Sequence, residues 1–289
     1  TIDDLIRVGH QLNMKSFSYN LIFGAYPDYE SLGIQTEWGM FKDRTHTEFD
    51  FHPLPTTWKA SQIYLMDPAN KGWQDYYIQA YKDFLSVFDF DGIQVDSLGA
   101  REYPIYDYNG NELQLDLRYS ELLDRMTKEL DTKIIFNAVS EYGQEDVASK
   151  VDLDIMFAEV WPWSHKSYNS LKDAVDNSRR LLGNDRGVVL PAYMDYDIKS
   201  SGEEFNLPGV LYTNAVIIAS GGQHLELGDN GMLSSEYYPG TTLKMSRDLV
   251  KATRNYYTFM TAYENVLRGG GLEEVTTRTY VNDEFCSLT

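Results

Sequence analysis

Cysteine and long apolar runs are nearly absent from this 289-residue sequence. Cys286 is the single cysteine, so no intrachain disulfide can form, and the redox compartment stays open. No run of about 18 apolar residues occurs, which predicts that no helix crosses a membrane. The first residues also lack the basic and then apolar pattern of a signal peptide. They predict instead that Thr1 caps a helix that begins at Ile2 and ends near Asn13.

Positive charge is also scarce. The chain has 25 Lys and Arg residues against 44 Asp and Glu residues, a formal net charge of −19 at pH 7. Nucleic acids and anionic membrane surfaces are bound through clustered basic side chains, so both are unfavourable partners for this sequence. A neutral or cationic partner is compatible with the charge, although acidity of this degree is also a common way to keep a protein soluble.

Several motifs that define whole reaction classes are missing. No G-x-G-x-x-G follows an expected strand, which argues against a dinucleotide cofactor, and there is no P-loop for phosphate chemistry. There is no G-x-S-x-G for Ser-His-Asp catalysis. Asp195 and Asp229 could form a metal pair, but no spacing of His, Asp and Glu resembles a catalytic metal site. The sequence therefore predicts an activity with no metal and no cofactor.

The sequence does have a globular composition rich in aromatic residues. Hydrophobic residues make up 43% of the chain and charged residues 24%, so a core of ordinary size can form. Aromatic residues make up 14%, with 22 Tyr and 5 Trp. Rings with a polar tip suit stacking on sugars, and they equally suit cores and interfaces. Packing is the simpler explanation for any one ring, whereas the excess as a whole favours a carbohydrate ligand.

Short apolar runs alternate with helical patterns along the chain, an order typical of buried parallel strands joined by helices. The pattern predicts a (β/α)8 barrel of the TIM type, about 250 residues in size, whose first strand is missing from this chain. The alternative is an open doubly wound sheet. Segment 26–60 is too long for a simple connection and is expected to be a loop at the active-site face. The expected strands are 16–23, 62–66, 92–95, 133–136, 153–158, 188–193 and 215–219, and the expected later helices are 73–88, 118–130, 167–182 and 243–265.

Polar side chains gather at the carboxyl ends of these runs, where barrel enzymes carry their catalytic groups. Carboxylates, amides and aromatic rings with few cations suit a neutral polyol. Asp96 follows the run ending at Val95, and Glu159 follows the run ending at Ala158. Trp161 predicts a partly apolar setting for Glu159, which raises the pKa of a carboxyl group and suits a proton donor. Two acids in unlike surroundings could divide glycoside cleavage between nucleophile and acid, but acids at strand ends also cap helices or bind metals.

Four segments together resemble glycoside hydrolase family 66, the dextranases and cycloisomaltooligosaccharide glucanotransferases. DGIQVDSLG at 91–99 is similar to the family's nucleophile motif, and AEVW at 158–161 looks like its acid/base segment. AYMD at 192–195 and GGQHLELGD at 221–229 also resemble family segments. The similarity extends over roughly residues 1–265, and four short motifs in one order are far more specific than any one of them.

The resemblance implies retaining hydrolysis of α-1,6-glucosidic bonds in dextran or isomaltooligosaccharides, with Asp96 as nucleophile and Glu159 as acid and then base. Retaining enzymes hold two such carboxyl groups about 5–5.5 Å apart. A polymeric substrate implies an enzyme outside the cell or on its surface. Family members usually carry further β domains, so we expect a catalytic barrel over 1–268 and, over 269–289, a linker and the start of a C-terminal β segment.

Three functions remain open from the sequence. An endo-dextranase is favoured, because no inserted carbohydrate-binding module, typical of the glucanotransferases, interrupts the expected strands. A cycloisomaltooligosaccharide glucanotransferase would use the same covalent intermediate and resolve it with a sugar hydroxyl instead of water. A non-catalytic glucan-binding barrel is disfavoured, because a binder has no need of both acids.

Several further polar and aromatic residues are candidates for substrate binding. Gln94 lies two residues before Asp96 and could orient it or merely fill a polar layer. Asn137 could bind a sugar hydroxyl or cap a loop, and Trp161 and Trp163 could stack on a sugar or pack beneath loops. Asp28, Asp67 and Glu226 are expected to be structural. The substrate-binding candidates are Gln94, Asn137, Trp161, Tyr193, Asp195, His224 and Asp229.

Overall fold

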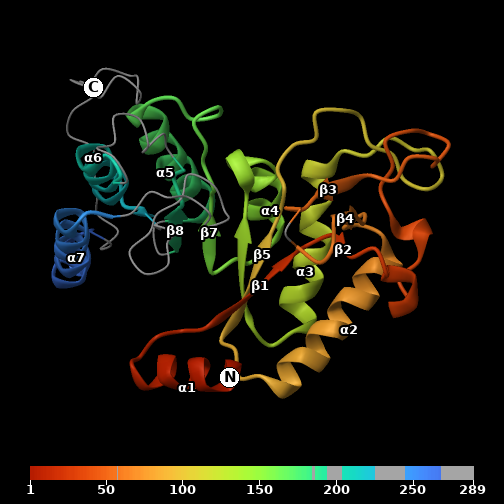
Figure 1. Cartoon of the computed structure of the whole chain (residues 1–289), viewed down its shortest axis with the longest axis horizontal. Helices are drawn as coiled ribbons and strands as arrows, with labels where there is room; N and C mark the ends of the chain where they lie inside the picture. The colour runs from red at the N-terminus through yellow and green to blue at the C-terminus, as the bar shows by residue number, and fades with distance from the viewer. Residues whose placement is uncertain (57, 184–185, 194–203, 225–244, 268–289) are drawn as a thin grey trace. The chain divides into compact units, whose positions relative to one another are not determined.

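The computed structural model describes residues 1–56, 58–183, 186–193, 204–224 and 245–267 (Figure 1). The chain forms two compact units. The first comprises Thr1–Asn137 and Tyr142–Asp154, and the second comprises Ala138–Glu141 together with the chain from Ile155 onward. Each unit has its own parallel strands and its own helices. In the part of the chain that the structure describes, no helix has the length and apolar character needed to cross a membrane.

Three parallel strands lie at the centre of the first unit. β5 (Gly92–Asp96) pairs on one side with β1 (Phe17–Leu21) and on the other with β6 (Lys133–Asn137). Val95 is paired with Phe136, whose ring contacts Tyr119 of the helical layer at 5.5 Å between centroids. Because side chains alternate along a strand, residues at the even-numbered positions of β5, Gln94 and Asp96, lie on the opposite face from that layer.

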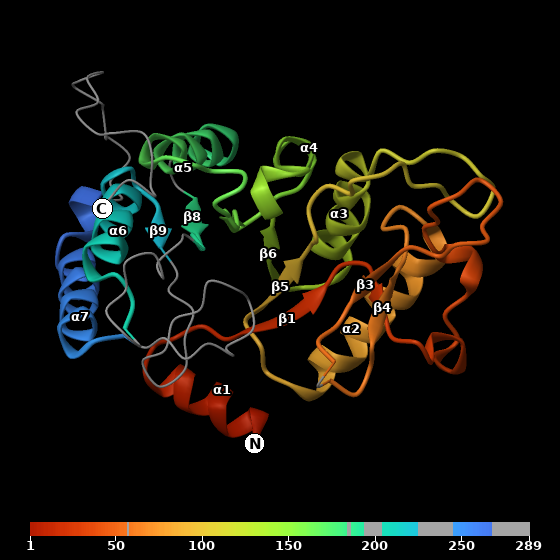
Figure 2. The same cartoon turned by 45° about the horizontal axis from the view of Figure 1, so that its top comes forward.

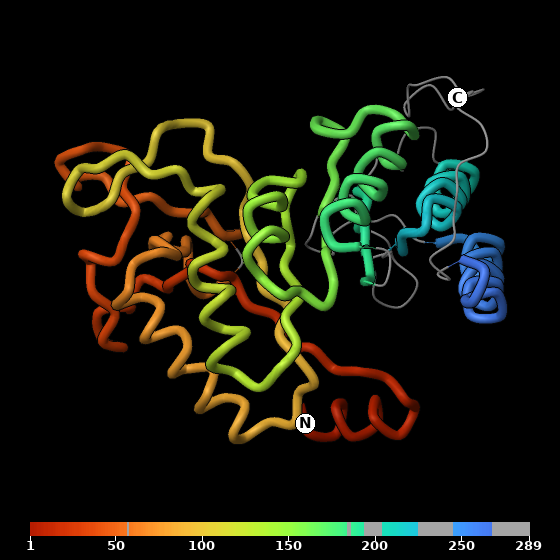
Figure 3. The backbone as a smooth tube through the Cα atoms, turned by 180° about the vertical axis from the view of Figure 1, so that it is seen from behind, coloured from red at the N-terminus to blue at the C-terminus, as the bar shows by residue number. Residues whose placement is uncertain are grey.

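The first unit contains four α-helices among its described residues. They are α1 (Ile2–Gln11), α2 (Lys71–Val87), α3 (Tyr119–Glu129) and α4 (Gln144–Lys150), and α2 and α3 lie side by side (Figure 3). Thr1 and Asp4 form a capping box at the start of α1, which confirms the predicted N-cap. The buried Trp73 of α2 donates its indole N–H to the carbonyl of Ile22 at 3.0 Å and so ties the helix to the segment after β1.

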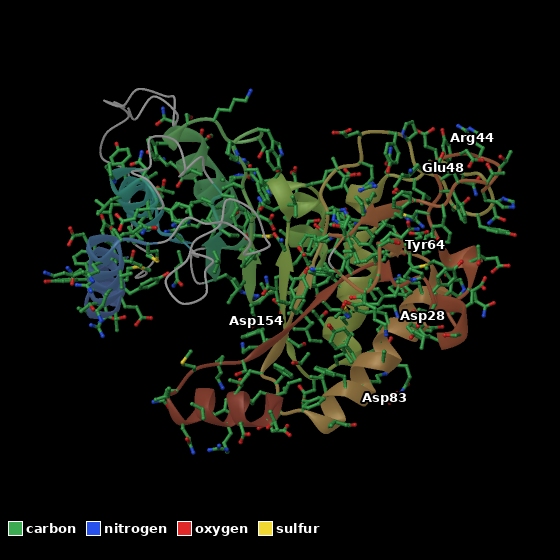
Figure 4. The ribbon with its side chains drawn as sticks, viewed as in Figure 1. Asp28, Arg44, Glu48, Tyr64, Asp83 and Asp154 are labelled. Atoms are coloured by element: carbon green, nitrogen blue, oxygen red, sulfur yellow. The ribbon has the colours of Figure 1, made fainter. Side chains whose placement is uncertain are left out.

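A small antiparallel sheet lies in the segment between β1 and α2. It has the order β2 (Gly24–Ala25), β4 (Gln62–Leu65) and β3 (Phe51–Pro53). Figure 4 shows the side chains here, with Arg44 and Glu48 on the loop before β3 and Tyr64 in β4. The expected long loop 26–60 therefore contains β3 and short 3-10 turns. Among the residues that the structure describes, the 3-10 turns are η1 (Tyr29–Leu32), η2 (Thr36–Trp38), η3 (Leu115–Leu117) and η4 (Val139–Glu141).

The second unit repeats the parallel arrangement. β8 (Gly187–Leu190) pairs with β7 (Ile155–Phe157) and with β9 (Gln223–His224). Its core joins apolar side chains of β8, such as Val188 and Leu190, to those of the helices, such as Leu171 and Ile217. Helix α6 packs against both α5 and α7 (Figure 2). The helices are α5 (Tyr168–Leu182), α6 (Leu207–Ala219), α7 (Arg247–Ala262) and α8 (Glu264–Leu267).

Two of the seven expected strands are corrected by the structure. The run 62–66 forms β4, which pairs antiparallel with its neighbours instead of joining the parallel strands. The run 215–219 lies inside α6, and β9 follows that helix. Helix α6 is apolar on nearly all sides, so the sequence carries no helical period there that would distinguish it from a buried strand. The other five strands and the expected helices are present, with ends shifted by a few residues. A closed barrel stays a prediction.

Candidate active site

Asp96 ends β5, and its carboxylate is almost enclosed, with 7% of the residue exposed. Three groups donate hydrogen bonds to it. The amide of Asn137 and the backbone N–H of Ser97 donate to Oδ1 at 2.6 and 2.8 Å, and the hydroxyl of Tyr19 donates to Oδ2 at 2.5 Å. An ionised carboxylate is an acceptor only, so this set of donors matches its charged form.

Strand register explains why these groups meet. Tyr19 is paired with Gln94, and Gln94 is paired with Ile135, so these three side chains lie on one face of the strands. Side chains two positions further along a strand lie on the same face. Asp96 and Asn137 therefore point to the same side at adjacent strand ends. The hydroxyl of Ser97 donates to the carbonyl of Asn137 at 2.8 Å, which fixes the two strand ends to each other.

Burial and hydrogen bonding have opposite effects on the charge of Asp96. Burial raises the pKa of Asp96 above its usual value, because a charged carboxylate loses its hydration. The hydrogen bonds from Tyr19, Asn137 and Ser97 lower the same pKa and offset part of that rise. A carboxylate that is poorly hydrated and held by fixed donors is suited to act as a nucleophile, because little solvent has to be removed from it before it reacts.

Gln94 lies on the same face as Asp96. Among the described residues, however, its side chain makes no hydrogen bond to the carboxylate of Asp96. The orienting contacts come from Tyr19 and Asn137. Asp67, which the sequence leads us to expect to be structural, binds Arg118 through both carboxylate oxygens at 2.5 Å and accepts the backbone N–H of Ala69 at 3.0 Å. Asp28 precedes η1, and its carbonyl accepts the hydroxyl of a serine in that turn at 2.7 Å.

Glu159 lies in the second unit, two residues beyond the end of β7, and only 7% of it is exposed. Its Oε1 accepts the indole N–H of Trp161 at 2.7 Å. Its carbonyl accepts the backbone N–H of Ser140 at 2.7 Å. Ser140 and Glu141 have φ angles of 52° and 63°, the left-handed region that side chains other than glycine rarely adopt. Such backbone strain is most often retained near functional groups.

Aromatic rings surround Trp161. Trp163 is stacked on it with centroids 4.5 Å apart and an interplanar angle of 16°. Tyr193 lies 4.4 Å from it at an angle of 33°. Tyr193 is buried, with 4% exposed, whereas Trp163 is 67% exposed. The predicted site residues Glu159, Trp161 and Tyr193 are therefore brought together by the strand ends of the second unit.

The remaining candidates are His224 and three acids outside the described residues. His224 is 5% exposed in β9, and its Nδ1 forms a hydrogen bond with the side-chain oxygen of Asn214 in α6. Asp195, Glu226 and Asp229 lie outside the described residues. In the described part of the chain, no group of three or more His, Cys, Asp and Glu side chains could hold a metal ion.

Sequence reasoning missed Tyr19. Its position in an apolar run is an ordinary one for tyrosine, and its contact with Asp96 spans 77 positions of sequence. Only the pairing of β1 with β5 reveals it. The distance between the carboxyl groups of Asp96 and Glu159 stays a prediction.

Comparison with known proteins decides the family. The family model described as glycosyl hydrolase family 66 matches residues 1–286. The chain belongs to glycosyl hydrolase family 66. The resemblance seen in the four sequence motifs is thereby confirmed.

Two kinds of relative are similar to this family member. A cycloisomaltooligosaccharide glucanotransferase from Niallia circulans is 34% identical over 227 residues, covering 74% of this chain and 22% of the relative. A dextranase from Streptococcus salivarius is 26% identical over 303 aligned positions, covering 91% of this chain and 35% of the relative. The chain thus spans about a fifth to a third of the length of these curated relatives.

The fold is shared with a solved structure. A Paenibacillus cycloisomaltooligosaccharide glucanotransferase, solved in complex with cycloisomaltoheptaose, aligns with a TM-score of 0.82 over 92% of this chain and 57% of that chain. The sequence identity is 22%, so this likeness concerns the fold alone.

Proposed function

We propose that this family 66 chain is the catalytic part of a retaining endo-dextranase, which cleaves the α-1,6-glucosidic bonds of dextran. Asp96 is the nucleophile and Glu159 the general acid and then base. The observation that carries the proposal is the carboxylate of Asp96, which is buried at a strand end and held by donors from Tyr19, Asn137 and Ser97. Among the described residues Asp96 has no ion pair, whereas Asp67, which we expect to be structural, is paired with Arg118.

The proposed reaction has two steps. First, a carboxylate oxygen of Asp96 attacks the anomeric carbon, the bond from that carbon to the glucosidic oxygen breaks, and Glu159 gives its proton to the departing oxygen. Second, Glu159 takes a proton from water while the water oxygen attacks the same carbon and releases Asp96. Two inversions give net retention of configuration.

Relatives named as a dextranase and as glucanotransferases support an α-glucan substrate for this chain. Dextran and isomaltooligosaccharides are the substrates that we propose, with the enzyme acting outside the cell or on its surface because the polymer is too large for import. Residues 1–268 would form the part of a (β/α)8-type barrel that this sequence contains, followed by a linker and the start of a β segment. Asn137 contacts Asp96, and the proposed substrate-binding residues are Gln94, Tyr193, Asp195, His224 and Asp229.

The direct test is incubation of dextran with the wild type, Asp96→Ala and Glu159→Ala. The wild type is expected to release isomaltooligosaccharides of retained α-configuration, detected by NMR before mutarotation, and both variants are expected to lose this activity. Asp83→Ala is the matched control, since Asp83 is an exposed acid of α2 whose carboxylate accepts a hydrogen bond from Gln79 one turn earlier (Figure 4). Full activity of Asp96→Ala would refute the assignment of the nucleophile. Dextran binding by the wild type without any cleavage would indicate a glucan-binding barrel.

A cycloisomaltooligosaccharide glucanotransferase is the second candidate, because a relative with 34% identity carries that activity in its name. The two activities differ in the acceptor that resolves the covalent intermediate. Hydrolysis creates one reducing end for each bond cleaved, whereas cyclisation creates none. Reducing-sugar assays run alongside mass spectrometry of the products therefore separate them: cyclic products, lighter by one water than the linear ones, would favour the transferase.

A further inference from the structure

The indole of Trp161 is hydrogen-bonded to the proposed acid/base. Its Nε1–H donates to Oε1 of Glu159 at 2.7 Å, at the short end of the range for an N–H donor and a carboxylate oxygen. Trp161 lies two residues after Glu159 in extended backbone, so both side chains project to the same side. The short spacing in the sequence therefore brings the indole N–H within reach of the carboxyl group.

Both faces of the Trp161 ring are occupied. Trp163 and Tyr193 lie 4.5 and 4.4 Å from it between centroids, at angles of 16° and 33°. Stacked rings lie about 3.5–4 Å apart between their planes, so a ring with its centroid about 4.5 Å from the indole is displaced sideways by less than one ring width. Two such rings on the same face of the indole would overlap each other. They therefore lie on opposite faces, and Trp161 has no face left on which a sugar could stack.

We propose that Trp161 is a positioning residue for Glu159, which rests on the proposed function, and that its stack with Trp163 and Tyr193 serves to hold the indole N–H in place. An indole N–H donates and cannot accept. The carbonyl oxygen of a protonated carboxyl group accepts hydrogen bonds better than its hydroxyl oxygen, so in the acid form this contact favours Oε1 as the carbonyl oxygen and Oε2 as the oxygen that carries the proton. The contact selects one rotamer of the carboxyl group and assigns Oε2 as the atom that protonates the glucosidic oxygen and later takes the proton from water.

This role differs from the sugar-stacking role that the sequence suggests for Trp161, and kinetics separate the two. Trp161→Phe keeps an aromatic ring between Trp163 and Tyr193 but removes the N–H. We expect kcat on dextran to fall about 10- to 100-fold, a part of what general acid catalysis contributes, with KM changed less than about threefold. On 4-nitrophenyl α-isomaltoside, whose phenolate leaves with little help from a proton, the loss should be at least about tenfold smaller.

Trp163→Phe is the matched control, because it changes a neighbouring indole of the same stack, keeps an aromatic ring there and leaves the Trp161 N–H that donates to Glu159. Its ratio of activities on the two substrates should equal that of the wild type. The ratio is measured within one preparation, so it does not depend on the fraction of a variant that has folded. Equal losses on both substrates in Trp161→Phe would mean that Trp161 only supports the fold, and a rise in KM for dextran alone would mean that it contacts the sugar. Either result would overturn the proposal.

The same assay distinguishes this inference from the function on which it rests. Glu159→Ala should show the strongest selective loss on dextran, because it removes the proton donor itself. If Glu159→Ala keeps its dextran activity, the proposed function fails. If Glu159→Ala loses dextran activity selectively and Trp161→Phe does not, only the role of Trp161 is refuted.

Discussion

Removing the hydroxyl of Tyr19 should move the acidic limit of activity to higher pH. The hydroxyl donates to Oδ2 of Asp96 at 2.5 Å, and this hydrogen bond lowers the pKa of a carboxyl group that burial has raised. Tyr19→Phe leaves the donors Asn137 and Ser97 in place, so the carboxylate stays oriented but is less well stabilised. A hydrogen bond to a charged group contributes about 1.5–3 kcal/mol, and 1.4 kcal/mol corresponds to about a factor of ten.

The nucleophile must be ionised, so the sign of the effect is fixed. Loss of the donor raises the pKa of Asp96 further, and kcat/KM for dextran on the acidic side of its profile should fall about tenfold or more, while the plateau at higher pH changes much less. The assay is the pH profile of kcat/KM from initial rates of reducing-sugar release. Tyr64→Phe, in the antiparallel sheet, is the control and should keep the wild-type profile. An unmoved acidic limit in Tyr19→Phe, or an equal loss at every pH, would refute this account of how Asp96 is charged.

Three further substitutions test the structure of the first unit. Gly92→Ala should lower the free energy of unfolding by about 1–3 kcal/mol in urea titrations, because the new Cβ would lie 2.7 Å from the carbonyl oxygen of Lys133; an unchanged value would show that the strands separate easily. Arg118→Met should lower it by about 3–5 kcal/mol, since Asp67 is left buried without its cation, and the double variant with Asp67→Asn should recover part of that loss. Asp96→Asn should abolish dextran cleavage yet raise the melting temperature at pH 7. Burial raises the folded pKa of Asp96 above 3.8, so its contribution to stability is complete below that pH and is lost as the pH rises; the gain should therefore vanish near pH 3.

The sequence allowed most parallel strands to be predicted, because a short apolar run bounded by turn residues has few other interpretations. It failed where that signal is ambiguous. The run 62–66 has the right composition for a strand, but composition does not say whether a strand pairs parallel or antiparallel. The run 215–219 belongs to a helix that is apolar on nearly all sides. The true strand, β9, has two residues, too few to leave a pattern.

The site was predictable to the extent that it depends on strand ends. Asp96 and Glu159 follow apolar runs directly, so their positions could be read from the chain. Tyr19 could not, because its role depends on β1 being the neighbour of β5, a fact of the tertiary structure. Trp161 was found by its proximity to Glu159, but only the ring geometry shows that its faces are covered and that its N–H is the group in use.

The two proposed catalytic acids are held by different means, and the difference matches their proposed roles. Asp96 accepts hydrogen bonds from two strands and from the residue that follows it, so its carboxylate is fixed by the register of β1, β5 and β6. A nucleophile must return to the same position after each turnover. Strand pairing keeps the hydrogen-bond donors of Asp96 in fixed positions, so the carboxylate returns to them without a change of rotamer in the donors. Glu159 is held by an indole two residues away, so its carboxyl group is set locally and can change protonation state without disturbing the strands. Substitutions that shift register should therefore impair Asp96 chemistry first, whereas loss of the indole N–H of Trp161 should impair proton transfer first.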